Sequence, residues 1–235
     1  MKVTIILALI LMWSEFFATK ASAELEETLI SDGWDEIKFE DFPENIFTAV
    51  DEVEGLSRQI QVTSEGTISI AFLNVEEVDL DVSPYLEWSW QSLTPLVDTD
   101  TTKKGGDDRT LAIYIAFPYQ PDEASFGDKV RRQAIELLRG PETPDRILTY
   151  IWGGGADRGE KIQNPYAGKN GQFIYLRTPK DEKETWFTER VNIQQDFIDA
   201  FGFEPVSPVY VGIGSDSDDT GIKIRARVKG LRFSN

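Results

Sequence analysis

Histidine and cysteine are both missing from this chain of 235 residues. Without histidine there is no imidazole base, no Ser-His-Asp triad and no histidine-ligated metal site. Without cysteine there is no thiolate nucleophile, no zinc–thiolate site, no iron–sulfur cluster and no disulfide. The chemistry that remains is that of carboxylates, lysine, tyrosine and oxygen-ligated cations, together with plain binding. A chain without disulfides is also stabilised by its core alone.

Positive charge is scarce as well. Lysine and arginine number 24 against 41 aspartates and glutamates, and the formal net charge is −17. Such a chain is repelled by nucleic acid and by anionic lipid, so neither is an expected partner. The apolar run at residues 3–13 is too short to span a bilayer, which needs about 20 residues.

The first 23 residues are typical of a secretory signal peptide, although a buried N-terminal helix is the alternative. Lys2 precedes the apolar run, and Ala21-Ser22-Ala23 is a small-residue cleavage motif. We therefore predict cleavage after Ala23. The mature protein, residues 24–235, is then expected to be soluble, periplasmic or secreted, and not inserted in a membrane. Its length suits a single domain.

Alternating apolar and polar residues indicate about ten short strands. Leu86, Trp88 and Trp90 share one face of such a strand, which predicts that both tryptophans lie in the core. Residues 56–63 and 67–73 flank a short glycine-containing turn, which predicts a hairpin. The pattern is that of an all-β fold, a single antiparallel β-sandwich or jelly roll.

Two stretches are predicted to form short helices. Residues 128–140 begin at a capping Asp128 and end at Gly140. Residues 192–202 have Asn192 as an N-cap and end at a glycine. No repeat or linker divides the chain.

The segment SDSDDTG, residues 215–221, carries three aspartates in a turn. It begins like a calcium-loop template, but Thr220 occupies the third ligand position and Arg227 stands where the bidentate glutamate is required. An EF-hand is therefore excluded. A calcium site of another kind and a solvated turn between strands both stay open. No cofactor is expected to be required, and the residues that would hold calcium are Asp216, Asp218 and Asp219.

A second acidic segment is VDTDTTKKGGDDR, residues 97–109, in which lysines and aspartates surround a glycine pair. It is too long for a simple hairpin turn, and long loops on rigid scaffolds often carry function. It is either a ligand-binding loop or a mobile surface loop. Its candidate ligand-binding residues are Asp98, Lys103, Lys104, Asp107 and Asp108.

Trp152 ends a predicted strand and enters a glycine-rich loop, where we expect it to be accessible for stacking against a sugar ring. Residues 222–229 place four cations on one strand face. They form either a floor for an anionic ligand or pairs with acids on neighbouring strands. These cations are Lys223, Arg225, Arg227 and Lys229.

Four segments in this order resemble a bacterial family known as domain of unknown function 3047: Asp98 followed by KKGGDD, then LTYIW, WFTERVNIQQDFIDAFG and SDSDDTG. The resemblance covers most of the chain. It implies a β-sandwich similar to jelly-roll, galactose-binding-like carbohydrate-binding modules, and no established activity. It also adds Arg190 and Asp196 to the candidate ligand-binding residues, the first as an anchor for one of the loops.

These features together predict an exported, non-catalytic β-sandwich that binds a polar ligand, such as a glycan of the cell envelope. Two alternatives stay open. One is a carbohydrate-active enzyme that uses Asp and Glu carboxylates, with or without calcium. The other is a structural envelope protein.

Overall fold

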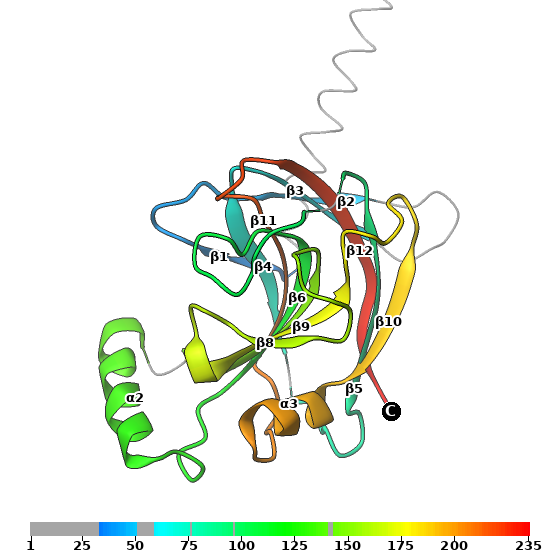
Figure 1. Cartoon of the computed structure of the whole chain (residues 1–235). Coiled ribbons are helices and arrows are strands. Elements are labelled where there is room, and N and C mark those ends of the chain that lie inside the picture. Colours follow the sequence, from blue (N-terminus) through cyan, green and yellow to red (C-terminus); the bar gives the residue numbers. More distant parts are fainter. Residues whose placement is uncertain (1–32, 51–58, 76, 96, 141–142) are drawn as a thin grey trace, which may run out of the picture.

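The computed structural model describes residues 33–50, 59–75, 77–95, 97–140 and 143–235. In this part of the chain twelve strands form two sheets that pack face to face as a β-sandwich (Figure 1). The predicted signal peptide lies outside the described residues. No described helix is long and apolar enough to cross a membrane.

One sheet has seven strands in the order β1-β4-β11-β6-β7-β9-β8. All neighbours are antiparallel except β7 and β9, which are parallel. The strands are β1 (Asp35–Lys38), β4 (Ile68–Asn74), β11 (Tyr210–Asp216), β6 (Arg109–Phe117), β7 (Arg146–Trp152), β9 (Gly171–Arg177) and β8 (Lys161–Gln163).

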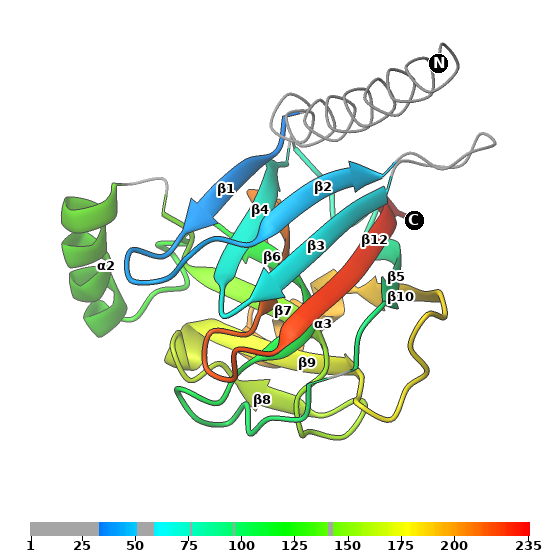
Figure 2. The same ribbon diagram turned by 90° about the horizontal axis from the view of Figure 1, so that it is seen from above.

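The other sheet has five antiparallel strands in the order β10-β5-β12-β3-β2. Figure 2 shows β2, β3 and β12 side by side above the other sheet. The strands are β10 (Phe187–Asn192), β5 (Tyr85–Ser92), β12 (Lys223–Ser234), β3 (Gln59–Glu65) and β2 (Ile46–Val50).

The core between the sheets is rich in aromatic rings. β5 alternates as predicted, and Leu86, Trp88 and Trp90 are at most 1% exposed. β6 is buried almost throughout, because it lies in the middle of the larger sheet. Phe117 at its end packs against Phe197 with ring centroids 4.5 Å apart. The all-β sandwich predicted from the sequence is confirmed.

The predicted hairpin of residues 56–73 is wrong. β3 and β4 follow each other closely in the chain, but β3 pairs with β2 and β12, whereas β4 pairs with β1 and β11. The chain therefore crosses from one sheet to the other at Gly66, which has a φ of 66°. β11 and β12 make the opposite crossing beside it, through the SDSDDTG segment.

A serine joins these two crossings. Ser217 is fully buried, and its Oγ lies 2.7 Å from Ser64 Oγ. The backbone N–H of Gly66 donates to the same oxygen at 3.0 Å. The turn that follows Ser217 closes when Gly221 N donates to the Ser217 carbonyl at 2.8 Å. The segment is thus a corner of the sandwich, and its second half emerges toward solvent.

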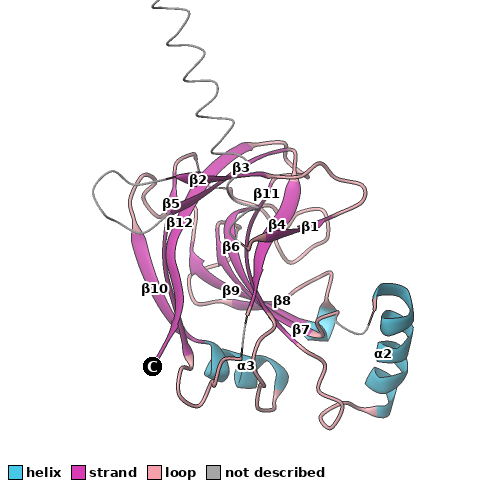
Figure 3. Cartoon of the chain, turned by 180° about the vertical axis from the view of Figure 1, so that it is seen from behind, coloured by secondary structure: helices cyan, strands magenta, loops and turns pink. Residues whose placement is uncertain are grey.

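Both predicted helices are present (Figure 3). α3 (Ile193–Phe201) begins at the predicted N-cap Asn192, whose side chain accepts from Gln195 N, and it ends at Gly202 in the left-handed conformation. α2 (Phe126–Arg139) is capped by Ser125, one turn before the predicted cap. Asp128 instead accepts a hydrogen bond from the Ser125 hydroxyl at 2.6 Å. Asp128 therefore supports the capping residue and is not the cap.

Candidate functional site

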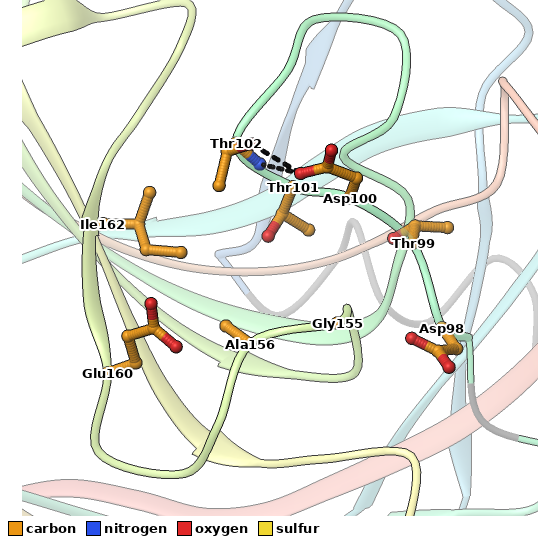
Figure 4. Close-up of a pocket in the computed structure, with 9 residues that line it drawn as sticks. All are labelled: Asp98, Thr99, Asp100, Thr101, Thr102, Gly155, Ala156, Glu160 and Ile162. Atoms are coloured by element: carbon orange, nitrogen blue, oxygen red, sulfur yellow. Dashed lines mark hydrogen bonds between the residues drawn. The ribbon is translucent and has the colours of Figure 1, made fainter.

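A pocket of about 410 Å³ lies between two loops at one edge of the larger sheet. One is the threonine loop, residues 97–108, which leads into β6. The other is the glycine loop, residues 153–160, which follows β7. Figure 4 shows the two groups of side chains facing each other. The lining residues are Asp98, Thr99, Asp100, Thr101, Thr102, Gly155, Ala156, Glu160 and Ile162.

Close backbone contacts between the loops explain the glycine run. Gly154 N donates to the Val97 carbonyl at 2.8 Å, and Gly155 N donates to the Thr99 carbonyl at 2.6 Å. A Cβ on Gly155 would lie 2.9 Å from that same Thr99 oxygen. The glycines therefore allow the loops to lie against each other, and the glycine loop is not open as the sequence suggested.

Hydroxyl groups fix the threonine loop against the sheet. The hydroxyls of Thr101 and of Tyr175, on β9, are hydrogen-bonded to each other. Thr99 Oγ1 donates to the backbone carbonyl of Asp108 at 2.6 Å. The loop is thus tied down at its middle and at its end, which gives the pocket a defined wall.

The pocket is acidic. Lys103 lies 2.5 Å from Asp100 and, together with Thr102, lowers the pKa of that carboxyl to about 2. Two more carboxylates, Asp98 and Glu160, line the pocket. Three carboxylates and no cationic side chain are among the lining residues, which disfavours an anionic ligand.

The second cluster, which we term the acidic corner, consists of Asp107, Asp108, Arg109, Asp216 and Asp218. The buried guanidinium of Arg109 lies 2.9 Å from Asp107 and 3.1 Å from Asp216, and it also donates to the Tyr114 hydroxyl. Burial raises the pKa of Asp216 to about 9, and the nearby carboxylate of Asp218 adds to this, although Arg109 opposes both.

Asp108 links the threonine loop to the SDSDDTG segment. Its carboxylate is fully buried and accepts hydrogen bonds from Thr220 N at 2.8 Å and from Asp219 N at 3.2 Å. One carboxylate oxygen each of Asp108, Asp216 and Asp218 lies within 4.8 Å of the others. The carboxyl group of Asp219, one of the three predicted metal ligands, is not in this group, and Asp108 takes its place.

A family model described as "Protein of unknown function (DUF3047)" matches residues 32–232. The chain belongs to this family. The predicted resemblance is therefore confirmed, and membership of DUF3047 brings no assigned activity. No curated protein matches the chain.

Several solved structures are similar to this DUF3047 chain in fold. One is a structure of carbohydrate-binding modules from the beta-sandwich superfamily. It is 10% identical to this chain, with a TM-score of 0.43, and the match covers 86% of this chain but only 57% of that one. The family 11 carbohydrate-binding module of a Clostridium thermocellum cellulase is 7% identical, with a TM-score of 0.42 and coverage of 86% and 88%. Endoglucanase 3 of Trichoderma harzianum, from family GH12, is 10% identical, with a TM-score of 0.41 and coverage of 86% and 90%.

The structure separates the predicted ligand-binding residues into groups. Asp98 lines the pocket, and Lys103 pairs with Asp100 beside it. Asp107 and Asp108 belong to the acidic corner. Lys104 lies 5.3 Å from the centroid of the Tyr166 ring, an exposed aromatic whose hydroxyl accepts from Gly105 N.

The other three lie elsewhere, and two expectations about them are wrong. Trp152 is fully buried, because it continues the inward-facing row of β7. It is a core residue, so it does not stack against a ligand. Arg190 does not anchor either loop, since its guanidinium donates to Glu87 at 3.1 Å and to the Asn235 carbonyl at 3.0 Å. Asp196, on α3, accepts from Tyr150 and Lys161 and is not among the pocket-lining residues.

The contacts of the β12 cations support the predicted pairing with acids at Lys223, whereas Arg227 contacts an amide and Lys229 contacts an aromatic ring. Lys223 forms a salt bridge of 2.8 Å with Glu65 on β3, and Arg227 donates to Gln61 on the same strand. Lys229 lies over the Trp186 ring at 4.2 Å from its centroid. These contacts brace one face of the smaller sheet.

Sequence reasoning missed the threonines and Glu160 as pocket residues, and Arg109 as the centre of the acidic corner. The threonines belong to the loop that was singled out for its charges, so their number was a usable signal. Glu160 had no such signal, because only the contact between the two loops brings it to the pocket.

Proposed function

We propose that this protein binds a glycan, without chemical change, in the pocket between the threonine and glycine loops. The observation that carries the proposal is the lining itself, in which carboxylates and threonine hydroxyls stand beside the apolar side chains of Ala156 and Ile162. A sugar offers hydroxyl donors around an apolar ring face, so both kinds of group have a partner. The volume is within the range of about 300–1,000 Å³ that is usual for small-ligand sites.

The charge of the pocket narrows the ligand class. The carboxylates of Asp98 and Glu160 accept hydrogen bonds from hydroxyls or ammonium groups and repel acidic sugars. We therefore expect neutral glycans or amino sugars to bind in preference to polymers of uronic acids. The predicted signal peptide extends the proposal to the periplasm or the exterior of the cell, where envelope glycans are found.

Affinity gel electrophoresis tests this proposal. The chain is run through gels containing neutral polysaccharides, amino-sugar polymers or uronic-acid polymers. Retardation by members of the first two classes and none by the third is the expected result. Retardation by no polysaccharide would contradict the proposal and favour a structural role in the envelope.

Two substitutions in the pocket and two matched controls outside it test whether binding takes place in the pocket. Asp98→Asn and Glu160→Gln remove pocket carboxylates and are expected to reduce retardation. Asp122→Asn and Glu123→Gln make the same changes at exposed positions outside the pocket and are expected to migrate as the wild type.

A carbohydrate-active enzyme remains the second candidate, because Asp98 and Glu160 come from different loops of one pocket. Two carboxylates flanking a glycosidic bond are the usual arrangement for its hydrolysis. Release of reducing ends from a retained polysaccharide, lost in Glu160→Gln, would favour this candidate over plain binding.

A further inference from the structure

Three carboxylates from separate segments converge at the acidic corner. Asp108 ends the threonine loop, Asp216 ends β11, and Asp218 lies in the turn before β12. Arg109 compensates part of their charge through its contacts with Asp107 and Asp216. Carboxylates so close together repel one another unless a proton or a cation joins them.

Within the described part of the chain, one buried oxygen of this cluster has no hydrogen-bond partner. Asp216 is 1% exposed, and its Oδ2 is held by Arg109. Among the described residues, Oδ1 of Asp216 receives no hydrogen bond and is shielded from solvent. A buried polar atom without a partner is costly, and such atoms are rare in folded proteins. This atom therefore marks a place where a ligand would add stability.

Asp108 is fixed in position for the same ligand. The N–H groups of Asp219 and Thr220 hold its carboxylate, one on each oxygen. Each carboxylate oxygen accepts more than one bond, so both retain capacity for a cation. Asp218 is half-buried, which leaves the cluster a side from which an ion and its water can enter.

We infer that Asp108, Asp216 and Asp218 bind a divalent cation, and that calcium fits the site better than magnesium. Calcium lies about 2.3–2.6 Å from its oxygen ligands, so it can join oxygens up to about 5 Å apart. Magnesium, at about 2.0–2.1 Å, joins oxygens at most about 4 Å apart. The three carboxylate oxygens lie within 4.8 Å of one another. Water and backbone carbonyls complete the shell in calcium sites of this kind.

Calorimetric titration and thermal unfolding of the EDTA-treated, purified chain at pH 7.5 test this inference. We expect one calcium ion to bind per chain, and the unfolding midpoint to rise by about 5–10 °C at a calcium concentration about 100 times the Kd. Magnesium is expected to give a smaller shift at the same concentration. Absence of both binding heat and midpoint shift with calcium would overturn the inference, and a proton on Asp216 would then account for the unpartnered oxygen.

Substitutions in the SDSDDTG segment test which aspartates bind the cation. Asp218→Asn and Asp216→Asn remove ligands and are expected to abolish the calcium-dependent rise; Asp218 is half-buried, so its variant is the one expected to fold as the wild type. Asp219→Asn changes the neighbouring aspartate, which is outside the three, and is expected to keep the rise. Loss of the response in Asp219→Asn, with retention in Asp218→Asn, would overturn the assignment. No glycan is present in these experiments, so their outcome is independent of the proposed binding function.

Discussion

Trp152 lies at the centre of an aromatic cluster in the sandwich core. Its ring centroid is 5.5 Å from that of Trp90 and 5.4 Å from that of Phe187, and no part of the side chain is exposed. Rings of this size contribute much of the apolar area buried in a core. At the scale of single residues, the aromatic side chains stabilise the fold, whereas the pocket is lined by polar and small apolar ones.

Replacement of Trp152 by alanine is expected to lower the free energy of unfolding by about 3–5 kcal/mol, because it leaves a large cavity. Urea denaturation followed by circular dichroism measures this change. Trp186→Ala, at a half-buried tryptophan beside Lys229, is the control and is expected to cost less. An unaltered midpoint in Trp152→Ala would show that the residue is not part of the core.

Strand periodicity alone could have predicted that Trp152 lies in the core. Leu148, Tyr150 and Trp152 alternate along β7, and all three are buried. The glycines that follow suggested an open loop, but they are there because two backbones lie in contact. A glycine run has both meanings in a sequence, and only the partner backbone decides between them.

At the scale of elements, the two sheet crossings are joined through one buried hydroxyl. Ser217 Oγ contacts Ser64 Oγ and accepts from Gly66 N, so it ties the β11–β12 corner to the β3–β4 corner. The same β11–β12 corner carries Asp216 and Asp218. The geometry of the acidic corner therefore depends on this contact.

Ser217→Ala is expected to cost about 1–3 kcal/mol, the usual penalty when a buried donor loses its partner. Chemical denaturation measures it, and Ser89→Ala is the matched control. Ser89 Oγ bonds Thr188 at an exposed position, where a change within about 0.5 kcal/mol is expected. Equal stability of the two variants would contradict the proposed role of Ser217.

The start of α2 is held by a charge pair. Lys169 lies 2.6 Å from Asp128, and these groups, with Ser125, lower the pKa of the Asp128 carboxyl to about 2 from its ordinary value of 3.8. A lowered pKa in the folded state means that the carboxylate stabilises the fold above pH 3.8. This contribution is lost as the pH falls through about 2.

We therefore expect the α2 amides to be better protected from hydrogen exchange in the wild type than in Asp128→Asn at pH 6, after correction for intrinsic rates. The difference in protection should shrink below pH 4 and be largely lost near pH 2. Asp122→Asn, at an exposed acid before the helix, should show no difference at either pH. A difference in Asp128→Asn that persists unchanged at pH 2 would contradict the assignment of its pKa.

At the scale of the whole molecule, the all-β class could be predicted from alternation, and both helices from helical spacing and their terminating glycines, whereas the cap of α2 could not. Which sheet each strand joins could not, because β3 and β4 lie close together in the sequence yet pair with distant strands. For the candidate site, the sequence could identify the loop that contributes to it, but not which residues of that loop lie together. Asp98 and Asp108 come from one segment but lie in different sites, and Glu160 reaches the first of these through long-range contacts.

The central claim is that the pocket between the threonine and glycine loops binds a glycan. Calorimetric titration of a retained glycan into the double variant Asp98→Asn/Glu160→Gln, beside the control Asp122→Asn/Glu123→Gln, tests it most directly. Loss of two charge-assisted hydrogen bonds is expected to weaken binding by about tenfold or more in the first variant only. An unchanged Kd in the pocket variant, with its fold intact, would contradict the claim.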